Sequence, residues 1–228
     1  MPTFGQTTTG SGGSSPNSND RYWASKFTLS EDGAVTKVTA FFDYDAGNTS
    51  NAGDNGKAVI YADSSGSPGA LVGVSSAVSI PAGDQTVDFP LTASLAAGDY
   101  WLGIVTDSFN SRLHKYSDTG GNHVRKESLT YASPGDPMGT PDATGSGIFG
   151  IYATYDVPVS LDQSHFRFRN DDGSETTATW AAAEDTPISL AKNTPVRLRV
   201  EIGATGDPAN AAYKLQYRKV GDSTWRDI

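Results

Sequence analysis

Ala97-Gly98-Asp99-Tyr100-Trp101-Leu102-Gly103-Ile104-Val105-Thr106 is the stretch that decides the fold, because it joins a turn signal to the most apolar run in the first two thirds of the chain. Successive side chains of an extended strand point to opposite faces of the sheet. Here one face carries Tyr100, Leu102 and Ile104, and the other carries Trp101, Gly103 and Val105. Since both faces are apolar, we predict a central strand with a core on one side and either a second layer or a stacking aromatic ring on the other.

The composition around this stretch favours an all-β protein. The 228 residues include 25 Gly and 12 Pro, and Ser, Thr, Asn and Asp are also frequent. These residues supply the turns between short strands. At 36% hydrophobic and 10% aromatic residues, the chain can build a substantial core.

Charge and cysteine content exclude several classes of function. The formal net charge is −9, so the basic footprint of a nucleic-acid-binding protein is missing. The chain has no cysteine, which removes disulfides, thiolate nucleophiles and cysteine-based metal sites. No apolar run approaches the roughly 18 residues that a membrane span needs, and we expect no membrane insertion.

The first part of the chain divides into an arm and a domain. Residues 7–20 contain no large apolar side chain, so we predict that residues 1–19 are a flexible N-terminal arm, either a disordered tail or an arm that orders on a partner. Residues 20–157 hold a series of short apolar segments separated by turns, and we predict that they form the first domain. The irregular stretch 117–147 is too long for a plain hairpin, which is typical of a functional or interfacial loop.

The pattern of apolar and polar residues changes in residues 158–228, which we predict to be a second domain. Three segments there alternate between apolar and charged or polar residues, as expected of a sheet with one wet face. The apolar sets are Phe166 and Phe168, then Val196, Leu198, Val200 and Ile202, then Tyr213, Leu215 and Tyr217. A turn at Asn170-Asp171-Asp172-Gly173 leads into a predicted strand at 175–180.

The first domain resembles a β-sandwich module of bacteriophage structural proteins and bacterial surface proteins, over about residues 20–156. The residues that carry the resemblance are Asp20-Arg21-Tyr22-Trp23-Ala24-Ser25-Lys26-Phe27, Ile60-Tyr61-Ala62-Asp63, Ala97-Gly98-Asp99-Tyr100-Trp101-Leu102-Gly103 and Ile151-Tyr152-Ala153-Thr154-Tyr155. This resemblance implies a jelly-roll-like or carbohydrate-binding-module fold.

The second domain is similar to fibronectin type III and other immunoglobulin-like modules. The similar residues are Tyr213-Lys214-Leu215-Gln216-Tyr217-Arg218-Lys219-Val220-Gly221-Asp222-Ser223-Thr224-Trp225, which match a middle strand of that family and its tryptophan hairpin. The fold expected for the whole chain is therefore all-β, a jelly-roll-like β-sandwich followed by a smaller immunoglobulin-like β-sandwich.

Catalysis finds little support in the sequence, and we predict that the chain is not an enzyme. His114, His123 and His165 lie far apart, and neither a Gly-x-Ser-x-Gly elbow nor a His-Glu-x-x-His helix occurs. Paired carboxylates are frequent, but chance pairs are expected among 26 acidic residues, so they do not single out a glycosidase dyad.

A calcium ion is the one cofactor that the sequence suggests. Asp43, Asp45 and Asp54 lie in or beside a loop rich in oxygen ligands, which hard cations prefer. The spacing is not that of an EF-hand, so a solvated loop without an ion is the favoured alternative.

Sugar binding is an alternative function for the first domain. The C–H face of a sugar ring packs on a flat aromatic ring while polar neighbours bind its hydroxyl groups. The candidate rings are Trp23, Trp101, Tyr116 and Tyr131. Core packing is the competing interpretation, favoured for Trp101. A cell-surface glycan would then be the partner.

The leading expectation is a non-enzymatic structural and interaction protein of a virion or of an extracellular surface filament, acting in decoration, attachment or assembly. Residues 158–228 offer only four or five strands, which leaves an apolar face incompletely covered and an edge unpaired. Phe166, Phe168, Leu215 and Tyr217 lie on that predicted face. We therefore expect a homo-oligomer, or contacts with other structural subunits, through this domain. The Met1–Gly5 start lacks the pattern of a secretory signal, which favours the virion setting.

Overall fold

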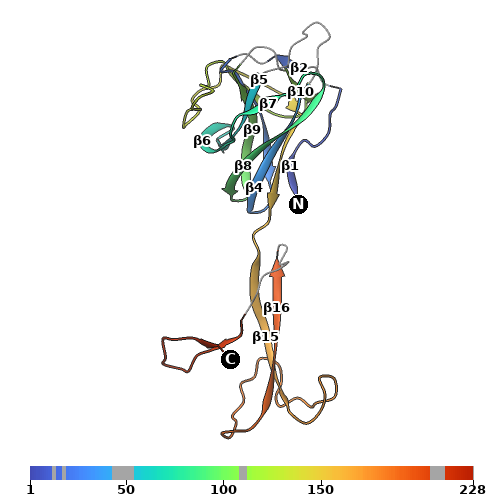
Figure 1. The fold of residues 1–228 in the computed structure, drawn as a ribbon, viewed down its shortest axis with the longest axis vertical. Coiled ribbons are helices and arrows are strands. Elements are labelled where there is room, and N and C mark those ends of the chain that lie inside the picture. The colour runs from blue at the N-terminus through green and yellow to red at the C-terminus, as the bar shows by residue number, and fades with distance from the viewer. Residues whose placement is uncertain (12–13, 17–18, 43–53, 108–111, 206–213, 228) are drawn as a thin grey trace. The chain divides into compact units, whose positions relative to one another are not determined.

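The computed structural model describes residues 1–11, 14–16, 19–42, 54–107, 112–205 and 214–227 (Figure 1). The chain divides into two compact units, Met1–Val157 and Pro158–Ile228, which we call unit 1 and unit 2. The described residues form strands, turns and loops without a helix, so the all-β prediction is confirmed. Accordingly, this part of the chain holds no helix with the length and apolar character that crossing a membrane requires.

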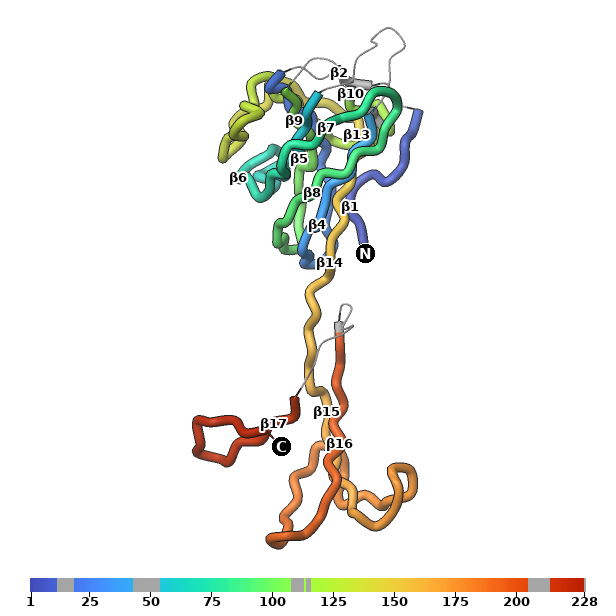
Figure 2. Tube along the Cα trace, viewed as in Figure 1, coloured from blue at the N-terminus to red at the C-terminus, as the bar shows by residue number. Residues whose placement is uncertain are grey.

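Unit 1 contains two antiparallel sheets. Strand β4 is central in the first sheet, pairing with both β8 and β14, and Figure 2 shows β4 and β8 side by side. The strands of this sheet are β1 (Thr3–Gly5), β2 (Ser14–Pro16), β4 (Gly33–Phe42), β8 (Gln85–Leu95), β10 (Arg112–Ser117), β13 (Ile148–Phe149) and β14 (Ile151–Asp156).

The second sheet of unit 1 is organised around β9 (Gly98–Thr106), the strand expected to be central. Strand β9 pairs with β3 (Tyr22–Leu29) on one edge and with β5 (Asp54–Ser64) on the other. The remaining strands of the sheet are β6 (Ser67–Val74), β7 (Val78–Ile80), β11 (His123–Lys126) and β12 (Ala143–Gly145).

Both faces of β9 are buried, in two separate clusters, as its alternation predicts. Leu102 and Ile104 belong to the large core that also holds Val38, Phe89 and Ile151 of the first sheet, which makes unit 1 a β-sandwich. The opposite face belongs to a second cluster, which includes Trp101 and Val105 of β9 and Leu129 and Met138 of the long loop. The irregular segment predicted at 117–147 thus supplies the second layer over β9.

Gly103 is the position in β9 where a larger side chain does not fit. A Cβ atom there would lie 2.4 Å from the carbonyl oxygen of Trp23 and 2.4 Å from the ring of Tyr22. Tyr22 is fully buried, and its hydroxyl donates to the carbonyl of Val59 (3.2 Å). The glycine therefore lets this tyrosine pack flat on the outer face of the sheet.

The N-terminal segment differs from the predicted flexible arm. Strand β1 pairs with β14, and β2 pairs with β10. Phe4 is buried in the core of unit 1, with its ring centroid 6.2 Å from that of Tyr100 and 6.0 Å from that of Tyr155. Phe4 thus anchors this polar segment together with its backbone pairing to β14.

Unit 2 contains two separate two-stranded sheets among its described residues. One is the antiparallel pair β15 (Ser160–Asn170) and β16 (Val196–Thr205), with a register shift between Gln163 and His165. The other is the short pair β17 (Gln216–Tyr217) and β18 (Arg226–Asp227). The immunoglobulin-like topology expected for this unit, like the jelly-roll topology of unit 1, stays a prediction.

The second edge of β15 is occupied by the segment that follows it. The backbone N–H of Asn170 donates to the carbonyl of Thr179 (2.9 Å), that of Ala181 to Phe168 (3.0 Å), and that of Asp185 donates to Phe166 (2.8 Å). Only an isolated bridge forms there, in place of the strand predicted at 175–180.

Candidate functional site

The β15–β16 hairpin has two chemically different faces, and the register decides which residues share each face. Directly opposed residues of an antiparallel pair lie on the same face. Phe166 opposes Val200 and Phe168 opposes Leu198, whereas Arg167 opposes Arg199 and Arg169 opposes Arg197. We call the first set, together with Ile202, the apolar face, and the four arginines the arginine face.

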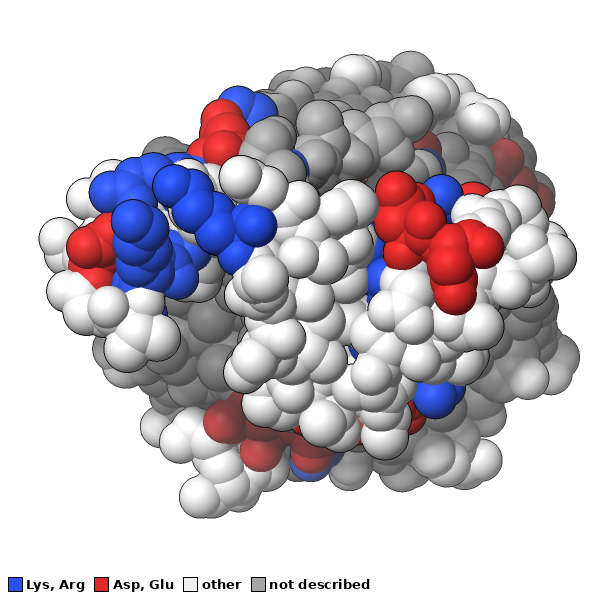
Figure 3. All heavy atoms as spheres, turned by 90° about the horizontal axis from the view of Figure 1, so that it is seen from below, with Lys and Arg blue, Asp and Glu red and all other residues white. Residues whose placement is uncertain are grey.

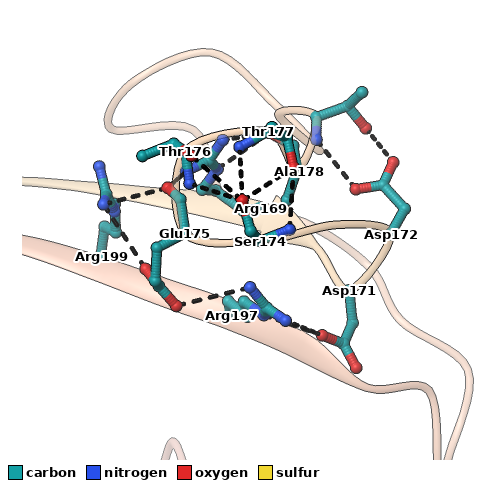
Figure 4. A network of polar contacts seen from close by, with 11 residues as sticks. Arg169, Asp171, Asp172, Ser174, Glu175, Thr176, Thr177, Ala178, Arg197 and Arg199 are labelled. Carbon is teal, nitrogen blue, oxygen red and sulfur yellow. Dashed lines mark hydrogen bonds and ion pairs between the residues drawn. The ribbon is translucent and has the colours of Figure 1, made fainter.

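The loop 171–185 packs on the arginine face and buries Arg169 there, while Arg199 stays exposed. For Arg169 this reverses the expectation that charged residues of an amphipathic strand face water. Arg169 is only 5% exposed. Its Nε donates to the carbonyl of Ala178 (3.1 Å), and its terminal nitrogens donate to the carbonyls of Ala178 and Glu175, as Figure 4 shows. A buried guanidinium is tolerated because its donors find oxygen acceptors.

Two further arginines hold the same loop through ion pairs. Arg197 Nη2 lies 2.7 Å from Asp171 Oδ1, and its Nη1 lies 3.5 Å from Glu175 Oε1 (Figure 4). Arg199 Nη2 lies 3.5 Å from Glu175 Oε2. Exposed pairs of this kind contribute little individually, so their combined effect is to orient the loop.

Trp180 completes the cover on the arginine face. Its ring centroid lies 4.1 Å from the guanidinium carbon of Arg167 and 4.6 Å from that of Arg169. Cation–π stacking of this geometry is favourable. Arg167 is fixed further by a bond from its Nε to the carbonyl of Ala182 (3.0 Å). Trp180 nevertheless stays 41% exposed.

The end of the loop is fixed by Asp185, which occupies a left-handed backbone conformation (φ 55°). Its Oδ2 lies 2.7 Å from His165 Nδ1, and its Oδ1 accepts from the backbone N–H of Phe166 (3.0 Å). The hydrogen bond to Asp185 raises the pKa of His165 above its ordinary value, and the same bond lowers the pKa of Asp185.

His165, Glu184 and Asp185 also form the one group of potential metal ligands among the described residues. One ligand atom of each lies within 4.8 Å of the others. All three side chains are exposed, and the hydrogen bond between His165 and Asp185 already satisfies two of the three ligand atoms. The group is therefore accounted for by its role at the end of the loop.

A cavity of about 310 Å³ opens beside Trp180 on the arginine face. Its walls combine two aromatic residues and a valine with two cationic and two anionic side chains and a histidine. These residues are His165, Phe166, Arg167, Trp180, Glu184, Arg199, Val200 and Glu201.

No described residue covers the apolar face in this way. Leu198 is 42%, Val200 38% and Ile202 52% exposed. Phe166 and Phe168 are partly buried, chiefly against each other, with their ring centroids 5.8 Å apart in an edge-to-face arrangement. A contiguous exposed apolar surface of this kind is typical of an interaction site.

The β17–β18 hairpin carries a second set of exposed apolar side chains, Leu215, Tyr217 and Trp225. Arg218 lies 4.9 Å from the Trp225 ring centroid. Residues 214–227 include four basic and two acidic side chains, although the chain as a whole carries −9. Figure 3 shows a face on which Lys and Arg side chains gather in one place and Asp and Glu side chains in others, with uncharged residues between them.

The two tryptophans predicted as sugar-stacking rings are buried instead, which corrects that expectation. Trp101 is 2% exposed, and its Nε1 donates to Asp63 Oδ1 (2.8 Å). Trp23 packs on Phe149, with ring centroids 5.5 Å apart, beneath the guanidinium of Arg125. The two rings lie in different clusters on opposite faces of the second sheet, so they cannot form one platform.

The two tyrosines of that prediction lie closer to the surface. Tyr116, in β10, is exposed. Tyr131 is partly buried against the outer cluster of unit 1, and Lys57 Nζ lies 4.6 Å from its ring centroid. Burial raises the pKa of Tyr131, with a further contribution from Asp107. Of the four predicted rings, Tyr116 is thus the one that is exposed, at 37%.

The predicted calcium ligands are only partly described. Asp43 and Asp45 lie outside the described residues. Asp54 is buried in β5, at 1% exposed, where its residue pairs with Ile80 of β7. The structure thus places Asp54 in a strand of the second sheet.

Sequence reasoning placed Phe166 and Phe168 on an apolar face of β15, and Leu215 and Tyr217 on the same predicted face. The structure places the second pair on a separate hairpin. Sequence reasoning missed Arg169 and Trp180, because alternation predicts a solvated arginine. A usable signal was the regular Arg spacing in both strands, since four like charges on one face need acidic or carbonyl partners nearby.

Comparison with known proteins adds no relative: no family model matches this chain, and no curated protein matches its sequence.

Proposed function

We propose that this chain is a non-enzymatic structural and interaction protein that assembles with other copies of itself through unit 2. The single observation that carries the proposal is the exposed apolar face of the β15–β16 hairpin, which none of the described residues covers. Burial of apolar surface is the dominant favourable contribution to most protein association. Leu198, Val200 and Ile202 each retain more than a third of their surface in contact with solvent.

The proposed occupant of this face is the β17–β18 hairpin of a second copy. That hairpin exposes Leu215, Tyr217 and Trp225, so it offers the apolar side chains that the face lacks. The net charges of the two segments are opposite: residues 214–227 carry two more basic than acidic side chains, whereas residues 158–213 carry eight acidic and five basic ones. Opposite net charge favours encounter of two copies.

The proposed contact joins two different surfaces, so it is heterologous. Contacts of this type generate closed rings when the rotation closes and open filaments when it does not. A virion component or an extracellular surface filament is the setting that we propose for such an assembly, on the resemblance of residues 20–156 to modules of phage and bacterial surface proteins.

The test is light scattering of the 228-residue protein and of two single variants over a range of concentrations. The wild type is expected to form oligomers whose mass grows with concentration. Val200→Glu in the apolar face and Tyr217→Glu in the hairpin should each remain monomeric. Leu190→Glu, which changes a similarly exposed side chain in the loop before β16, is the matched control and should assemble like the wild type.

Mixing the two variants separates a heterologous contact from a symmetric one. The Val200→Glu protein keeps its hairpin, and the Tyr217→Glu protein keeps its apolar face, so a mixture can form one intact contact and should yield dimers of one copy each. A symmetric interface predicts no such rescue. A wild type that stays monomeric at high concentration would overturn the proposal.

A further inference from the structure

We propose that the cavity beside Trp180 is a binding site for a neutral saccharide. Most of the residues that line the cavity belong to the arginine face and its loop. Phe166 and Val200 also line it, so Val200→Glu, one of the assembly variants, changes a wall of this site as well. Its volume, about 310 Å³, is at the lower end of the range of small-molecule sites. One or two sugar rings are ligands of that size.

Trp180 supplies the platform. Arg167 and Arg169 both approach its ring from β15, at 4.1 and 4.6 Å, and hold it against the hairpin. The ring still lines the cavity and is 41% exposed, so apolar surface remains for a ligand to cover. A sugar has a flat C–H surface that packs well on an indole, because the ring face is negative and the C–H groups are weakly positive.

The walls supply hydrogen-bonding groups of both kinds. Arg167 and Arg199 are donors, while Glu184 and Glu201 are acceptors, and all four line the cavity. A hydroxyl group donates and accepts at once, so a polyhydroxylated ligand can satisfy both sets. Bonds to charged partners are the stronger ones, which suits a ligand that must compete with water.

The charge balance argues against an ionic ligand. Two guanidinium groups and two carboxylates line the cavity, and Arg199 and His165 already have acidic neighbours, Glu175 and Asp185. An anion would meet Glu184 and Glu201, and a cation would meet the two arginines. Neither an anionic nor a cationic ligand gains net attraction, whereas a neutral ligand meets no charge repulsion.

Saturation-transfer NMR on the full chain tests the site, with maltose, cellobiose, lactose and chitobiose as probes at millimolar concentration. At least one disaccharide should receive saturation at its C–H protons. Glucuronate and glucosamine, which carry a negative and a positive charge at neutral pH, should compete weakly. Preferred binding of either ion, or no transfer to any of the four disaccharides, would overturn the proposal.

Two kinds of variant locate the binding. Trp180→Ala should abolish the transfer, whereas Tyr116→Ala, which removes an exposed aromatic ring of unit 1, should leave it unchanged. Because Trp180→Ala also removes packing from the loop, the double variant Glu184→Gln and Glu201→Gln provides a second test. It keeps the shape of the walls and should weaken binding about tenfold, since it replaces charged acceptors by neutral ones. Unchanged affinity in the double variant would contradict the assignment.

Discussion

Unit 1 and unit 2 build sheets from similar alternating strands and cover them in opposite ways. In unit 1 the central strand β9 has both faces buried, Leu102 and Ile104 in one cluster and Trp101 and Val105 in the other. In unit 2 the buried side chains among the described residues are those of Arg169 and Ala178. Unit 1 buries its apolar residues, whereas unit 2 buries an arginine.

This difference shows that alternation alone does not decide which face of a strand is covered. The long loop over β9 brings Leu129 and Met138, so it covers an apolar face. The loop 171–185 brings backbone carbonyls, carboxylates and Trp180, so it covers a cationic face. The chemistry of the covering loop selects the face. Hydrophobic burial therefore builds the core of unit 1, whereas in unit 2 hydrogen bonds and ion pairs to guanidinium groups hold the loop 171–185 on the hairpin.

The largest expected effect is in the core of unit 1. Leu102→Ala removes a fully buried side chain between the sheets and should lower the free energy of unfolding of unit 1 by about 3–5 kcal/mol. Leu198→Ala, the same change on the exposed face of unit 2, should alter stability by no more than about 0.5 kcal/mol. Denaturant unfolding followed by hydrogen exchange in each unit measures both. Equal losses for the two variants would contradict the contrast between the units.

The next effect concerns the N-terminal segment. Phe4→Ala should destabilise unit 1 by about 3 kcal/mol, because it empties a buried site between Tyr100 and Tyr155. A flexible arm predicts no change at all. The midpoint of thermal unfolding decides between them, with Thr8→Ala, in the same segment, as the control.

The fold of unit 1 was predictable where a strand carries its own signal. The two apolar faces of β9 predicted a central strand with two covering layers, and both layers are present. Strand β1 carried no such signal, because Phe4 is alone among polar neighbours and pairs with Ala153, far away along the chain. Local pattern does not report a contact at that sequence distance.

The two faces of the hairpin in unit 2 were predictable from the sequence, but the face that the loop covers was not. The alternation of Phe166 and Phe168 with two arginines predicted the two faces of the hairpin. It could not predict which face the loop covers, since that depends on the carbonyls of Glu175 and Ala178, and every residue has a carbonyl. The burial of Arg169 is a tertiary effect that overrides the usual exposure of arginine.

A smaller effect is expected at Arg169 itself. Arg169→Leu leaves the carbonyls of Glu175 and Ala178 without a donor and should release the loop, at a cost of about 1–3 kcal/mol. Amide exchange at Asn170 and Ala181, which bond across the edge of β15, should accelerate. Arg169→Lys should give exchange rates between those of the wild type and of the leucine variant, because an ammonium group cannot reach both carbonyls and stack on a ring at once. Unchanged exchange in the leucine variant would mean that the guanidinium does not hold the loop.

The smallest effect is the pH dependence of the loop end. The pKa of His165 is raised by its bond to Asp185, so the stabilisation from that histidine is present below its unfolded pKa and is lost as the pH rises through the raised value.

The pKa of Asp185 is lowered, so its stabilisation is present above its unfolded pKa and is lost as the pH falls through the lowered value. The loop end should therefore be most stable between the lowered pKa of Asp185 and the raised pKa of His165. The protection of the Asp185 backbone amide against exchange, relative to its intrinsic rate at each pH, should be greatest in that window and fall on both sides, because this N–H donates to the carbonyl of Phe166. His165→Asn should remove the loss of protection at alkaline pH and keep the loss at acidic pH. The asparagine side chain does not titrate, while Asp185 still does. Exchange at the amides of unit 1 serves as the internal reference, and a loss of protection on one side only in the wild type would show that the pair does not hold the loop end.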